Sequence, residues 1–242
     1  MNHRRALLIS TILYSSIASG KPSVQIPKVF FEHSYPYDLY CPKPPQPENP
    51  SPECPNPEEP PITPAMQEEL AGLLPELQRQ WDDLGVKLLS KTIELMSKKF
   101  NRQELSASLT LCPWNIPTSY PLLIAVRPYL KSASDHPRSR TYLMSMVYHE
   151  LLHRYLMEAF PDILVMNTPL LKKYKKEDGV TLVHLHVFAI QKAVFLAMNR
   201  QDLLNETIIN DSKIPHAGYR RGWEIVNDIE GYLPFITEIL SQ

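Results

Sequence analysis

Residues 138–160 read RSRTYLMSMVYHELLHRYLMEAF, a stretch whose apolar side chains occur on nearly every side of a helix. A helix that is apolar nearly all round is buried in the core of a folded domain. Pro161 follows directly, and proline cannot continue a helix, so we expect the helix to end there. The sequence therefore predicts a buried central helix around which the rest of the domain packs.

Within this helix, His149, Glu150 and His153 form the pattern HExxH. Residues four apart lie on the same face of an α-helix, so both imidazoles can bind one metal ion. Glu150 projects about 100° around the helix and can reach a water on that ion without binding the metal. Two imidazoles, an open coordination position and a carboxylate base are typical of a zinc hydrolase. The structural alternative is a pair of core histidines, but buried polar groups need partners, and a metal with its water supplies them.

The chain has 242 residues, of which 43% are hydrophobic, and a net charge of −1. This length allows one sizeable core, or one domain with a tail. The charge shows no basic excess, so nothing in the composition indicates a nucleic-acid partner or binding to an anionic membrane surface.

The N-terminal part of the chain is expected to lie outside the catalytic domain. Residues 1–20 resemble a secretory signal peptide, with Arg4 and Arg5 before a short apolar run and small residues after it. We expect export to the periplasm or the extracellular space, with no stable membrane span after signal cleavage. Residues 21–62 are aromatic and then rich in proline, which predicts an extended linker. The catalytic domain is expected over residues 63–242.

The three cysteines suit an exported protein. Cys41 and Cys54 flank the proline-rich segment, and in an oxidising compartment they can bridge. Cys112 is the odd one, and we expect it to be a small buried apolar residue.

The order of the predicted elements gives a helix-rich α+β fold. Helical spacing begins at Thr63-Pro64 and has a break near residues 83–85, and two strands are expected at 105–112 and 122–130. After the central helix come apolar helices at about 180–200 and 221–240, the last one split near 231–234.

This order around HExxH resembles the zincin-like metallopeptidases, in which a small sheet packs on the active-site helix and further helices follow. The resemblance covers residues 63–240 in architecture and only the five motif residues in sequence. It implies that the strand before the motif helix, here 122–130, is the sheet edge that pairs with a peptide substrate. Pro128 suits such an edge. Leu156 and Ala159 exclude the metzincin subclass, which requires Gly and His there.

A catalytic zinc needs a third protein ligand. We expect His186, because it lies on the apolar face of the helix 180–200, among alanines that permit close helix packing. His184, on the more polar face of that helix, is one alternative. Glu224 is the other, because Glu224 and Asp228 resemble the ExxxD pattern of gluzincins.

The sequence thus predicts an exported zinc metallopeptidase that hydrolyses peptides or proteins. Glu150 is expected to assist the attack of a zinc-bound water on the peptide carbonyl. Tyr219 and His216 are candidate donors to the oxyanion. The alternative is a secreted metal-binding or interaction protein on the same fold that does not turn over a substrate.

Overall fold

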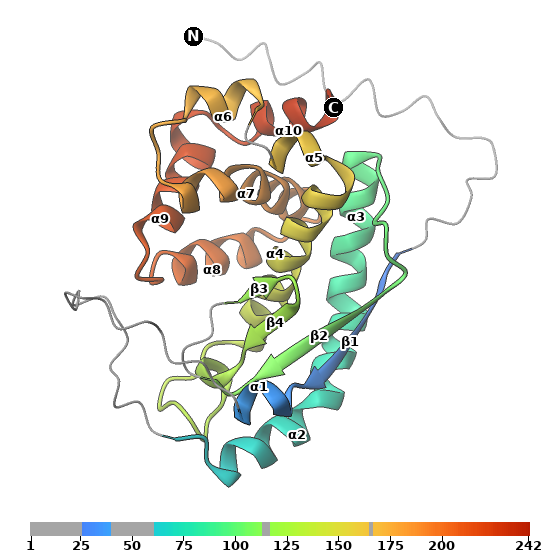
Figure 1. Ribbon diagram of the computed structural model, residues 1–242, viewed down its shortest axis with the longest axis vertical. Helices are drawn as coiled ribbons and strands as arrows, with labels where there is room; N and C mark the ends of the chain where they lie inside the picture. Colours follow the sequence, from blue (N-terminus) through green and yellow to red (C-terminus); the bar gives the residue numbers. More distant parts are fainter. Residues whose placement is uncertain (1–25, 40–60, 113–116, 165–166) are drawn as a thin grey trace.

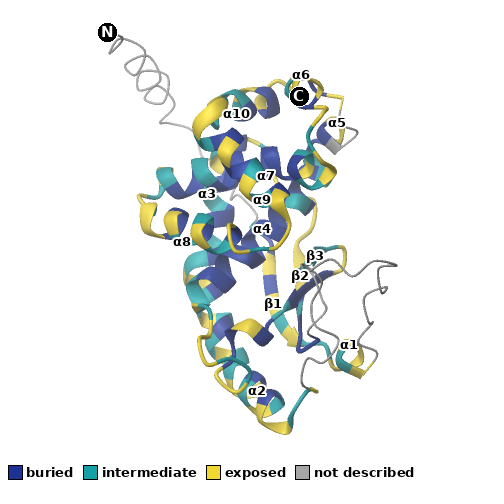
Figure 2. Cartoon of the chain, turned by 90° about the vertical axis from the view of Figure 1, so that its left-hand side faces the viewer, coloured by how far each residue is buried: buried dark blue, intermediate teal, exposed yellow. Residues whose placement is uncertain are grey.

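The predicted central helix is α4, Arg140–Ala159, in a computed structural model that describes residues 26–39, 61–112, 117–164 and 167–242 (Figure 1). Ser139 caps its start, because the hydroxyl oxygen accepts a hydrogen bond from the Tyr142 N–H at 3.0 Å. Phe160 caps its end, directly before Pro161. Most of its side chains are buried, and Figure 2 shows α4 in the middle of the molecule. The prediction of a buried central helix is confirmed.

Helices and a small sheet surround α4, and the predicted helix-rich α+β class is confirmed. Before α4 lie α1 (Tyr35–Leu39), α2 (Pro64–Gln80), the π-helix η1 (Trp81–Gly85), α3 (Val86–Met96) and the 3-10 helix η2 (Arg127–Tyr129). After it come α5 (Pro161–Leu164), α6 (Pro169–Lys173), α7 (Gly179–Ala197), α8 (Gln201–Asp211), α9 (Ala217–Glu224), the π-helix η3 (Ile225–Ile229) and α10 (Leu233–Leu240). The break expected near 83–85 falls in η1, and the split expected near 231–234 separates η3 from α10.

Among the described residues, four strands form one sheet in the order β1-β2-β4-β3. The strands are β1 (Lys28–His33), β2 (Glu104–Thr110), β3 (Thr118–Ser119) and β4 (Leu122–Ala125). β1, β2 and β4 run parallel, while β3 pairs antiparallel with β4, with Ser119 opposite Leu122. The sheet lies beside α2 and α3 in Figure 1, and β3 and β4 contact α4.

Two predictions about the sheet are wrong. The folded domain does not begin at residue 63, because β1 comes from the segment that was expected to be a linker and pairs along its whole length with β2. The strand expected at 122–130 is only Leu122–Ala125, and it is not an edge, because it lies between β2 and β3. Pro128 lies in η2 instead. The edge nearest α4 is β3.

Cys112 is buried, as expected, but it is disulfide-bonded and so is not the unpaired cysteine. The chain has three cysteines. The expected bridge between Cys41 and Cys54 is not tested by this. Both lie outside the described residues, as do the expected signal peptide and the proline-rich segment.

α7 is the second helix that positions the site. It is long and apolar enough to cross a membrane by composition, but 67% of that apolar window is buried inside the protein. Asp178 caps its start by accepting a hydrogen bond from the Thr181 N–H at 3.0 Å. α7 packs against α3, α4, α8, α9 and α10, so we describe it as a core helix of the domain.

Candidate metal centre

Three histidines from two helices meet beside the middle of α4. His149 and His153 lie one turn apart on α4, and His184 lies near the start of α7. Their candidate ligand nitrogens all lie within 4.8 Å of one another. The Nε2 atoms of His149 and His153 are 3.1 Å apart, and the His184 ring centroid lies 4.7 Å from that of His153. The structure thus brings the two motif histidines together with one of the three residues considered as a third ligand.

Hydrogen bonds at Nδ1, the ring nitrogen away from the cluster, hold the imidazoles of His149 and His184. Nδ1 of His149 lies 3.3 Å from Oε1 of Gln191, and Nδ1 of His184 lies 2.6 Å from the carbonyl oxygen of Val180. Both oxygens can only accept, so each ring donates from Nδ1. The Nε2 lone pairs of His149 and His184 are therefore available for a metal ion.

The three imidazoles are neutral at pH 7. Burial, helped by the neighbouring His184 ring, lowers the pKa of His149 to about 3. Burial also lowers the pKa of His184 to about 4. The pKa of His153 is held well below its usual range by burial and by the two other rings. Neutral imidazole is the form that binds metals.

Glu150 is the acidic group of the site. Its side chain is buried, and Ser119 on β3 donates a hydrogen bond from Oγ to Oε2 at 2.8 Å. Burial raises the pKa of Glu150 to about 7, and the hydrogen bond from Ser119 partly opposes this rise. A carboxyl with a pKa near 7 can both accept and return a proton at neutral pH.

Tyr219 and His216, the expected oxyanion donors, both lie in the segment at the start of α9. The Tyr219 ring centroid is 4.5 Å from that of His184. Burial raises the pKa of the Tyr219 hydroxyl, and the nearby Glu150 raises it further, so this hydroxyl is a donor at neutral pH. His216 is exposed, and its Nδ1 accepts a hydrogen bond from the Gly218 N–H at 3.1 Å, which caps α9. Tyr219 is thus the better placed of the two.

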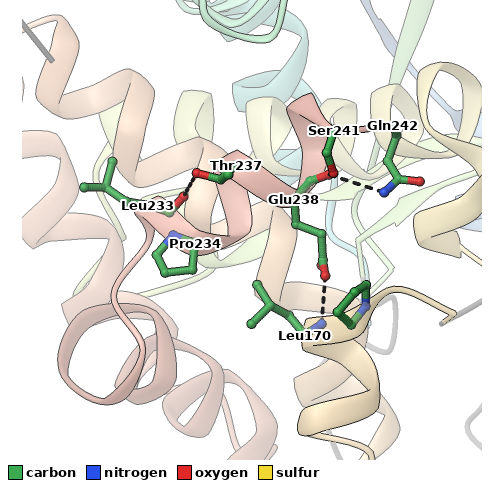
Figure 3. A pocket seen from close by; sticks show the side chains of 8 residues that line it. Leu170, Leu233, Pro234, Thr237, Glu238, Ser241 and Gln242 are labelled. Carbon is green, nitrogen blue, oxygen red and sulfur yellow. Dashed lines mark hydrogen bonds between the residues drawn. The ribbon is translucent and has the colours of Figure 1, made fainter.

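His186 lies outside the cluster, which corrects the expectation that it would be the third histidine. Its Nε2 donates to Oε2 of Glu238 at 2.7 Å, and its ring packs edge-on against Phe235 of α10. Glu238 also accepts a hydrogen bond from the Leu170 N–H at 2.7 Å, at the wall of an open pocket between α6 and α10 (Figure 3). His186 and Glu238 form a buried polar pair that ties α7 to α10.

Glu224, the other alternative, is exposed at the end of α9 and pairs with Arg221 at 2.8 Å. It is not part of the histidine cluster. The structure therefore leaves His184 as the third residue of the cluster.

Ser119 and Gln191 are two site residues that the sequence analysis missed. Ser119 belongs to a two-residue strand with no periodic pattern to mark it. Gln191, in contrast, could have been found from its spacing in the sequence. It follows His184 by seven residues, or two helical turns, and so shares its face of a largely apolar helix. That shared polar face was a sign of the site.

Comparisons with known protein families, with curated proteins and with solved structures give no match to this chain. The interpretation of the site thus depends on its own geometry and chemistry.

Proposed function

We propose that this protein is an exported zinc-dependent peptidase with a zincin-like catalytic domain. The cluster of His149, His153 and His184 directly beside Glu150 is the observation that carries the proposal. Export is proposed from the N-terminal sequence, and the disulfide at Cys112 suits an oxidising compartment.

The residues present fit a zinc ion. Zinc in catalytic sites is held by three protein ligands and keeps a fourth position open. Two nitrogens bound to one tetrahedral zinc lie about 3.3 Å apart, and Nε2 of His149 and Nε2 of His153 lie 3.1 Å apart. Three neutral imidazoles, two of them with Nδ1 held by a hydrogen bond, are also a donor set that zinc prefers. We therefore assign His149, His153 and His184 as the residues that would hold the metal.

A bound zinc would supply a Lewis acid and lower the pKa of a water in the site. Glu150 is placed to take a proton from that water and to return it to the leaving amine, since its pKa of about 7 suits both transfers. Ser119 keeps the Glu150 carboxylate oriented from the side of the sheet. Tyr219, protonated at neutral pH, is the candidate donor to the developing oxyanion.

The sheet supports a peptide substrate. β3 is the terminal strand, so its outer edge has no strand partner among the described residues. An extended peptide can pair with such an edge by backbone hydrogen bonds. Because Ser119 belongs to β3 and contacts Glu150, a peptide on this edge would lie next to the base. The open edge of β3 beside Glu150 therefore supports an extended peptide as the substrate.

The test measures zinc content and cleavage of an unfolded protein for the parent chain and three variants. We expect about one zinc per parent chain and chelator-sensitive cleavage. Glu150→Gln should keep zinc and lose about 10²- to 10⁴-fold in cleavage rate. His153→Ala should lose zinc as well. His136→Ala is the matched control, because His136 is exposed and lies outside the cluster, and it should change neither property.

Two results would overturn the proposal. If the parent chain binds no zinc after supplementation, the site does not hold this metal. If Glu150→Gln cleaves as fast as the parent, the assigned base is wrong. Zinc binding by a parent chain that cleaves no unfolded protein would favour the alternative, a secreted metal-binding protein without turnover.

A further inference from the structure

α4 and α7 run antiparallel across the metal centre. Their contacts show this orientation. The ring of His153 packs against that of His184 at one end, and Ser145 is hydrogen-bonded to Gln191 two helical turns away. Phe188 packs against His149 between these two pairs, at a ring distance of 5.6 Å. The facing sides of the two helices thus carry a row of polar groups that extends beyond the three histidines, with Phe188 packed against its middle.

The end of this row is a buried chain of hydrogen bonds. Nδ1 of His149 bonds Oε1 of Gln191 at 3.3 Å, and Nε2 of Gln191 donates to Oγ of Ser145 at 3.0 Å. Ser145 in turn shares a hydrogen bond of 2.7 Å with the hydroxyl of Thr207 on α8. All four side chains are at most 2% exposed. A buried polar chain of this kind is costly to leave incomplete, so each member restricts its neighbour.

We propose that Gln191 is a positioning residue for His149, and that it selects the ring tautomer that can bind the metal. This inference rests on the proposed function. The amide nitrogen of Gln191 can only donate and its oxygen can only accept. With the nitrogen held by Ser145, the oxygen faces Nδ1 of His149, which puts the ring proton on Nδ1 and leaves Nε2 for the metal. A reversed amide would present its N–H groups to Nδ1 and force the proton onto Nε2.

Gln191 acts on His149 through the chemistry of its amide group as well as through its position. Gln191 is fully buried, and its amide oxygen accepts a hydrogen bond from Nδ1–H of His149. Ser145 and Thr207 then act through Gln191, because Ser145 accepts the hydrogen bond of the amide nitrogen and is itself bonded to Thr207. Gln191 does not touch the reacting atoms.

The experiment compares zinc affinity, measured by competition with a chromophoric chelator, among the parent chain and four variants. Gln191→Met keeps the shape and removes the acceptor, so we expect affinity to fall about 10- to 100-fold. Gln191→Glu keeps an acceptor and should remain within about threefold of the parent. Ser145→Ala removes only the anchor of the amide and should weaken binding by a smaller factor than Gln191→Met.

Thr92→Val is the matched control. Thr92 is also fully buried and bonds the Tyr148 hydroxyl of the same central helix at 2.7 Å, but it does not contact His149. Both Thr92→Val and Gln191→Met should lower the stability of the metal-free protein, whereas only Gln191→Met should change zinc affinity. The visible absorption of the cobalt-loaded protein should likewise change in Gln191→Met alone, because it reports on the ligand field at the metal.

The outcomes separate this inference from the proposed function. If the parent binds zinc and Gln191→Met binds it equally well, the positioning role is overturned while the metal site stands. If the parent chain binds no zinc, the proposed function and the positioning role of Gln191 are both wrong. If Gln191→Met does not fold, Ser145→Ala decides, and an affinity equal to that of the parent overturns the role of the chain.

Discussion

Replacing Glu150 by Gln tests the environment of the proposed base without any substrate. The side chain is buried, and its pKa is about 7 in the folded protein against an ordinary value of 4.5. The proton on this carboxyl therefore stabilises the fold, fully below pH 4.5, and this contribution is lost as the pH rises through 7. Each unit of pKa difference corresponds to about 1.4 kcal/mol, so the parent should lose about 3 kcal/mol of unfolding free energy from Glu150 between pH 4.5 and about pH 8.

Glutamine cannot ionise and keeps an oxygen that can accept the hydrogen bond from Ser119. In metal-free protein, the unfolding free energy of Glu150→Gln minus that of the parent should therefore rise by about 3 kcal/mol from pH 4.5 to about pH 8. Urea unfolding in the presence of a chelator measures both curves. Glu104→Gln, at an exposed strand position, is the control and should follow the parent at every pH. Parallel curves for the parent and Glu150→Gln would refute the raised pKa and with it the argument that burial tunes the base.

Four further substitutions test the assignments around the cluster and the packing of α9 on α7. His184→Ala should lower zinc affinity by at least about 100-fold. His186→Ala should keep zinc and lose about 1–3 kcal/mol in urea unfolding, since buried Glu238 loses its hydrogen-bond partner on α7. Equal loss of zinc in both variants would contradict the assignment of His184, and not His186, as the third ligand. Tyr219→Phe should keep zinc and slow cleavage by about 10²-fold; an unchanged rate would remove Tyr219 from the reaction. Gly222→Ala would place a Cβ 2.7 Å from the Phe188 ring, so the protein should lose about 1–3 kcal/mol of stability, measured by thermal unfolding. An unchanged melting temperature would contradict this close packing of α9 on α7.

The sequence by itself determined the central helix, its end at Pro161, the HExxH pattern and the positions of the breaks in the long helices. These features depend on neighbours within a few residues, such as apolar periodicity, a capping side chain or a proline. The place of His149 and His153 on one face follows from helical geometry alone. For this reason a single sequence was enough to find two of the three clustered histidines and the acid beside them.

Only the tertiary structure decided how the sheet is assembled. β1 comes from a segment with no clear alternating pattern, and it is held by backbone pairing with β2, which lies far along the chain. The same holds for β3, whose two residues become an edge because β4 pairs with them. Strand order and strand pairing depend on residues far apart in the chain. Local sequence patterns therefore do not predict them.

The tertiary structure also decided between His184 and His186. The sequence argument assumed that the apolar face of α7 turns toward the motif helix. α7 is instead packed by other helices on several sides, so an apolar face is no guide to which neighbour it meets. The side with His186 meets Glu238 of α10, and the side with His184 and Gln191 meets α4. The third histidine of the cluster was therefore determined by the rotation of one buried helix among its neighbours.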